Sequence, residues 1–163
     1  MPESNSGTAP NQVVEAADGV RYTYRRFGTA RPGALPLVFL QHFRGNLDNW
    51  DPALIDPLAA GREVILVDYA GVGGSTGTPA TTVAETAAGV TAFLDALGVG
   101  RYDLFGFSLG GFVAQELALT VPHRVRRLVL AGTAPEGGRE TSTTGPARSR
   151  RRPGATSPPG RTC

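Results

Sequence analysis

Short apolar runs alternate along the chain with longer segments in which apolar residues recur at helical spacing. Residues 37–40, 64–67 and 102–107 form nearly continuous hydrophobic runs, which is typical of strands buried on both faces of a sheet. Residues 125–131 form a fourth run and are also predicted to be a buried strand. Buried strands that alternate with helices predict βαβ units and a parallel sheet.

Three segments between these runs are predicted to be helices. Asp51 and Pro52 begin the first, because they supply an N-cap and a proline suited to the first turn. Residues 82–97 form the second, with apolar side chains every three or four positions and a glycine after its end. Residues 109–120 form the third, which a proline two positions later terminates.

A β-hairpin is predicted before the first buried run. Residues 13–16 and 20–27 flank the dipeptide Asp18-Gly19, a strong signal for a tight turn between antiparallel strands. Residues 1–11 precede it and are expected to be a flexible leader. The predicted architecture is an α/β fold in which a hairpin is followed by parallel strands with flanking helices.

Composition and charge divide the chain at about residue 136. The net charge is +2 over 163 residues. Residues 137–163 carry six Arg and one Glu, a balance of +5, which leaves −3 for the rest. This segment has no large apolar side chain, so we expect a disordered tail. The foldable domain is expected to span residues 12–136.

Several classes of protein are excluded at this stage. A single cysteine and two histidines cannot form a disulfide within the chain or a His/Cys metal cluster. The sequence indicates no metal and no organic cofactor, and nothing in it suggests a need for one. No apolar run approaches the roughly 18 residues of a membrane span, and the polar start lacks the order of a signal peptide. The arginines of residues 148–152 lack interleaved aromatic residues. We therefore expect a cytoplasmic protein without membrane or nucleic-acid partners.

The motif that carries chemistry is Gly106-Phe107-Ser108-Leu109-Gly110, a G-x-S-x-G sequence. It follows a predicted strand and precedes a predicted helix, which is the setting of a nucleophile elbow. Small residues at Gly106 and Gly110 allow the sharp turn, and Ser108 becomes the candidate nucleophile. The alternative is a glycine-rich turn in which Ser108 only caps the helix.

With this motif the chain resembles the α/β-hydrolase family. Residues 37–50 are similar to the family's strand and oxyanion loop, in which a tryptophan closes the segment. Residues 68–75 are similar to its D-x-x-G-x-G-x-S sequence, and residues 121–131 to the end of the helix after the nucleophile and the sixth strand. The resemblance covers residues 12–135 and implies the N-terminal part of an α/β-hydrolase fold, with strands one to six.

The resemblance also implies an oxyanion hole. Gln41 and His42 stand where the family usually has His and Gly, and Phe43 falls on the position that contributes a backbone N–H. The second donor is the N–H of Leu109, the residue after the nucleophile. Such donors stabilise the negative charge that develops when serine attacks a carbonyl. An ester or other acyl compound is therefore the expected substrate class.

The acid and histidine that complete the family's triad are not identified. His123 lies at the far end of a helix of about 11 residues, roughly 16 Å from Ser108. His42 is interpreted as a loop residue, with the role of a base as the less favoured alternative. Glu136 follows the sixth strand and is either a triad-type acid or an exposed loop residue, whereas Asp68 is interpreted as a structural cap.

These observations predict a truncated hydrolase domain. The tail consists of the residue types that a GC-rich gene encodes out of frame, so we hypothesise a frameshift near residue 137; the alternative is a genuine basic tail. We predict a serine hydrolase for small ester or acyl substrates that is nearly inactive as this chain alone. The alternative is a non-catalytic fragment that is inert or binds a partner. An exposed sheet edge at the sixth strand is expected to cause self-association.

Overall fold

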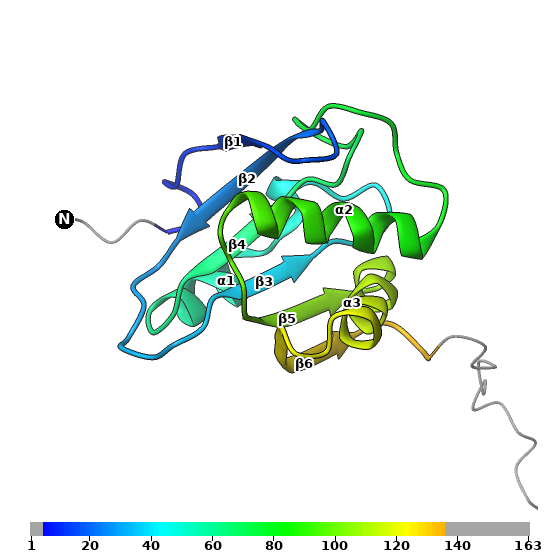
Figure 1. The fold of residues 1–163 in the computed structure, drawn as a ribbon. Coiled ribbons are helices and arrows are strands. Elements are labelled where there is room, and N and C mark those ends of the chain that lie inside the picture. Colours follow the sequence, from blue (N-terminus) through cyan, green and yellow to red (C-terminus); the bar gives the residue numbers. More distant parts are fainter. Residues whose placement is uncertain (1–4, 136–163) are drawn as a thin grey trace, which may run out of the picture.

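A computed structural model describes residues 5–135, and a six-stranded sheet organises them (Figure 1). The strand order is β1-β2-β4-β3-β5-β6. The first two strands form the predicted hairpin, and β2 pairs antiparallel with β4. Strands β4, β3, β5 and β6 are mutually parallel. The elements are β1 (Gln12–Glu15), β2 (Arg21–Phe27), β3 (Leu37–Leu40), the 3₁₀ turn η1 (Leu47–Asn49), α1 (Pro52–Ala59), β4 (Val64–Val67), α2 (Val83–Ala96), β5 (Tyr102–Phe107), α3 (Leu109–Thr120) and β6 (Val125–Ala131).

Helices cover both faces of the sheet. In Figure 1, α2 and α3 lie in front of the sheet and α1 lies behind it. One buried cluster packs side chains of α2 and α3 against one face of the strands, including Val38 and Leu104. A second cluster packs Ile55 of α1 against the opposite face, where Phe39 lies. This mixed α/β architecture confirms the predicted fold class.

The helix starts follow the capping chemistry of the sequence. The Asp51 side chain accepts a hydrogen bond from the Ala53 N–H and caps α1. Thr82 and Glu85 form a capping box at the start of α2, in which each side chain accepts from the other residue's backbone. Both helices therefore begin where the sequence predicts.

Strand β6 is not the buried strand that the sequence predicts. Leu128, Val129 and Leu130 are 37%, 48% and 43% exposed. The physical reason is that β6 lies at the edge of the described sheet and pairs only with β5. Apolar residues of this strand thus form an exposed edge, as the sequence analysis expected, and self-association through it stays a prediction.

The N-terminal end of the described chain packs against the domain. Residues 5–11, expected to belong to a flexible leader, contact the domain: the Ser6 N–H donates to Asp56 at 2.9 Å, and Ala9 is buried beside α1. Residues 1–4 and 136–163 lie outside the described residues. The predicted disordered tail and Glu136 fall in that second segment.

A buried carboxylate ties β5 to its neighbours at the end of the sheet remote from Ser108. Asp103 is 2% exposed, and its Oδ2 lies 3.1 Å from Arg62 and 2.7 Å from Arg126. Burial opposes ionisation of Asp103, but the hydrogen bond from Arg126 and the nearby positive charges hold its pKa below the usual value. The ionised carboxyl therefore stabilises the fold.

We expect Asp103→Asn to lower the free energy of unfolding at pH 7 by about 2 kcal/mol, because charged hydrogen bonds are lost from a buried site. The folded pKa lies below the unfolded value, so this contribution is present above about pH 4 and disappears as the pH falls through the folded pKa. Urea unfolding of both proteins at several pH values measures it. The control is Asp48→Asn, which removes a carboxylate paired with Arg25 but 70% exposed; a loss as large as that of Asp103→Asn would contradict the argument.

Candidate active site

Ser108 occupies a sharp turn between β5 and α3. Its φ is 53° and its ψ is −116°, a combination that costs energy in a residue with a Cβ. The Ser108 N–H donates to the Ala131 carbonyl at 2.9 Å, and its own carbonyl accepts from Gly111 at 2.9 Å. These bonds fix the turn between the two parallel strands and the helix. The local geometry is that of the predicted elbow; the nucleophilic role of Ser108 remains a prediction.

The elbow glycines lie where backbone segments approach closely. A Cβ on Gly106 would lie 2.7 Å from the Gly111 Cα. A Cβ on Gly110 would collide with the Leu40 carbonyl and lie 2.8 Å from the Gln41 carbonyl oxygen. These glycines therefore let α3 pack directly on β5 and on the carboxyl end of β3.

The loop that follows β3 carries the other predicted oxyanion residue, Phe43. The fully buried Gln41 side chain donates to the Asn46 carbonyl at 2.5 Å and so closes the loop on itself. Its backbone carbonyl accepts a hydrogen bond from the Tyr69 hydroxyl at 3.2 Å. Gln41 thereby holds the loop at the position where the family usually has histidine. The sequence analysis missed Tyr69, whose one signal was its place directly after Asp68.

Asp68 secures the same loop from its other end. Its carboxylate accepts from the Leu47 N–H and from the Gly74 N–H, both at 2.8 Å. Burial raises the pKa of Asp68, while these two N–H bonds oppose the rise. The predicted role as a structural cap agrees with these bonds, which join the loops after β3 and β4.

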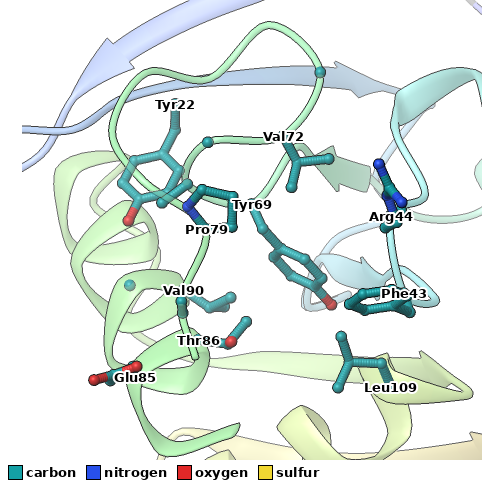
Figure 2. A pocket seen from close by; sticks show the side chains of 15 residues that line it. Tyr22, Phe43, Arg44, Tyr69, Val72, Pro79, Glu85, Thr86, Val90 and Leu109 are labelled. Atoms are coloured by element: carbon teal, nitrogen blue, oxygen red, sulfur yellow. The ribbon is translucent and has the colours of Figure 1, made fainter. Parts of the chain in front are cut away.

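A pocket of about 480 Å³ opens between these loops and α2 (Figure 2). Phe43 and Leu109 both line it, beside Tyr69. Neither backbone N–H of these two residues donates a hydrogen bond within the described structure. The structure thus brings both predicted oxyanion residues to one wall of a pocket, with two N–H groups available.

Backbone strain occurs at the same place. Within residues 5–135, Ser108 and Arg44 are the non-glycine residues with positive φ, at 53° and 62°. Ser108 stands in the turn directly before Leu109, and Arg44 stands in the loop that carries Phe43. Strained backbone clusters at functional sites in proteins, so its occurrence in both loops supports this region as the site.

The comparison with known proteins decides the family. A model of the alpha/beta hydrolase fold matches residues 36–161. The chain belongs to the α/β-hydrolase fold family. The match runs past residue 136 into the segment predicted to be a disordered or out-of-frame tail, which lies outside the described residues, so both tail hypotheses stay predictions.

Individual known proteins resemble the chain over about 70–80% of its length. An alpha/beta hydrolase fold protein from Chitinophaga pinensis has 42% identity and a TM-score of 0.77, covering 81% of this chain and 47% of that one. A 2-hydroxy-6-oxononadienedioate/2-hydroxy-6-oxononatrienedioate hydrolase from Burkholderia vietnamiensis is 40% identical, covering 74% of this chain and 42% of its own. A dihydrolipoyllysine-residue acetyltransferase component of an acetoin cleaving system from Cupriavidus necator is 40% identical; the match covers 69% of this chain and 29% of that protein. The chain therefore spans less than half the length of each of these relatives.

The two histidines of the chain lie in different environments. His42 packs edge-on against Phe107, with ring centroids 5.8 Å apart. His123 is exposed on the turn after α3, so a helix of 12 residues, about 18 Å long, separates it from Ser108. The structure thus keeps His123 away from the elbow, as the sequence predicts.

Neither a metal-binding cluster nor a membrane-spanning helix occurs among residues 5–135. In this range no group of three or more His, Cys, Asp or Glu side chains is arranged to hold a metal ion. None of the helices there is long and apolar enough to cross a membrane.

Proposed function

We propose that the chain is a serine hydrolase of the α/β-hydrolase type that acts on a small ester or other acyl substrate, with Ser108 as the nucleophile. The observation that carries the proposal is the strained backbone of Ser108 at the junction of β5 and α3, beside glycines that cannot carry a Cβ. Membership of the family and relatives that are hydrolases support it.

The reaction follows from the groups at the elbow. The Ser108 Oγ attacks the acyl carbonyl carbon, and its proton passes to water, because no side chain in the described part of the chain is assigned as its base; water also protonates the departing alkoxide. The carbonyl oxygen becomes an oxyanion that accepts from the N–H groups of Phe43 and Leu109. Water then attacks the acyl-serine ester, and the acid product leaves with Ser108 restored. Perhydrolysis and acyl transfer use the same groups with a different acceptor.

The placement of the histidines favours a second candidate function. In this α/β hydrolase His123 lies beyond the reach of Ser108, and His42 contacts Phe107. A chain without a base for Ser108 is impaired as an enzyme, because the serine hydroxyl is a weak nucleophile until its proton is removed. The alternative is therefore a non-catalytic hydrolase fragment that is inert or binds a partner.

Prolonged exposure to an excess of a fluorophosphonate tests the nucleophile. We expect a single slow adduct, which peptide mass spectrometry locates on Ser108. The Ser108→Ala variant should carry no adduct at any serine. An adduct elsewhere, or none on Ser108 after days of exposure, would favour the non-catalytic alternative.

A further inference from the structure

The pocket beside the oxyanion loop has an apolar interior. Phe43, Val72, Pro79, Val90 and Leu109 contribute apolar side chains to its walls (Figure 2). An apolar wall of this kind favours a ligand with a hydrocarbon body, because such a body leaves water on binding.

The polar side chains of the lining are already engaged within the protein, with one exception. Three hydroxyl groups donate hydrogen bonds: that of Tyr22 to Asp18, that of Tyr69 to the Gln41 carbonyl, and that of Thr86 to the Thr82 carbonyl. The Glu85 carboxylate accepts from Thr81 and Thr82. The N–H and hydroxyl groups of Thr81 and the N–H of Thr82 also hold the pKa of Glu85 below its usual value. The three hydroxyl groups thus already donate within the protein, and none of them has a free O–H to offer a ligand carboxylate.

The exception is Arg44. Its guanidinium makes no hydrogen bond or ion pair with any residue in the range 5–135, and its side chain is exposed to solvent. Figure 2 places Arg44 at the opposite side of the pocket from Glu85, next to Phe43. The pocket therefore has an uncommitted positive charge at one end and an internally bonded carboxylate at the other.

We propose that this pocket binds an acyl group with a hydrocarbon body and a terminal carboxylate, which the Arg44 guanidinium holds. The proposal rests on the proposed function, because the reacting carbonyl would lie at the Phe43 and Leu109 N–H groups. A planar guanidinium matches a carboxylate through two parallel hydrogen bonds. The substrate class is thus a half-ester of a dicarboxylic acid.

Ligand binding tests the proposal without any chemistry at Ser108. The full chain carrying Ser108→Ala is titrated with monomethyl adipate, a half-ester with a carboxylate, and with dimethyl adipate, its neutral counterpart. Backbone amide shifts in an NMR spectrum report binding. We expect the half-ester to bind about fivefold more tightly, the effect of one solvent-accessible ion pair, and the preference to fall as salt is added.

Two variants locate the preference. Arg44→Gln should remove it while leaving the affinity for dimethyl adipate unchanged. Arg101→Gln is the matched control, because Arg101 is an exposed arginine outside the pocket lining; it makes the same charge change and should retain the preference.

Three results would overturn the assignment: equal affinity for the two esters, a preference that survives Arg44→Gln, or no binding of either ester. None of them depends on fluorophosphonate labelling of Ser108. Failure of the nucleophile and failure of this substrate class are therefore distinguishable.

Discussion

Fluorophosphonate should react with Ser108 of this chain about 10⁶-fold more slowly than with the serine of an α/β hydrolase that has a complete triad. Removing the histidine of a serine triad costs about this factor in turnover. In this chain His123 lies at the far end of α3, a helix of 12 residues. The measurement is the second-order rate constant of labelling for both proteins under identical conditions.

The variants of this experiment separate the remaining possibilities. Ser108→Ala sets the background, and His42→Ala should label as slowly as the unsubstituted chain, because within residues 5–135 the His42 ring makes no hydrogen bond to Ser108 and packs on Phe107 instead. Labelling within a hundredfold of the complete enzyme would contradict the expectation. If His42→Ala then abolished the fast reaction, His42 would be the base.

Local chemistry explains why most of the fold could be predicted from sequence. The continuous apolar runs of β3, β4 and β5, the Asp51 cap and the Thr82 cap each act within a few residues, and each element begins or ends close to its predicted position. How far the side chains of β6 are exposed could not be predicted from local sequence in this way. Its Leu-Val-Leu sequence resembles that of the central strands, but burial depends on neighbouring strands, and β6 pairs only with β5 in the described sheet.

The candidate site, too, could be predicted from the sequence only where its geometry depends on neighbouring residues. The elbow was predictable because the spacing of Gly106, Ser108 and Gly110 is local and the turn requires small neighbours. The contact of Tyr69 and the proposed carboxylate-binding role of Arg44 could not be predicted from the sequence. Each depends on where the loop after β3 meets the loop after β4 in space. The hydrogen bond from Tyr69 to the Gln41 carbonyl joins residues 28 positions apart. Residue types alone contain no signal for such a contact.

The close approach of α3 to β3 leads to the second large effect. Gly110→Ala should destabilise the domain by about 3 kcal/mol or more, because a Cβ at this position would meet two backbone carbonyls, those of Leu40 and Gln41. Backbone cannot rotate away as a flexible side chain can, so the helix must move as a unit and the packing on β3 is lost. Overpacking of this kind typically costs 1–3 kcal/mol and sometimes more.

Urea unfolding followed by circular dichroism measures this loss, with Gly100→Ala as the matched control. Gly100 is exposed and has no atom within 4 Å of the place where a Cβ would lie. The same substitution there should change the free energy of unfolding by no more than about 1 kcal/mol, and in the stabilising direction, since alanine restricts the unfolded chain. Equal midpoints for the two variants would show that α3 does not need the contact with β3. The packing predicts that Gly110→Ala unfolds at urea concentrations at which Gly100→Ala is still folded. Only the first substitution separates the elbow from the strand that carries the oxyanion loop.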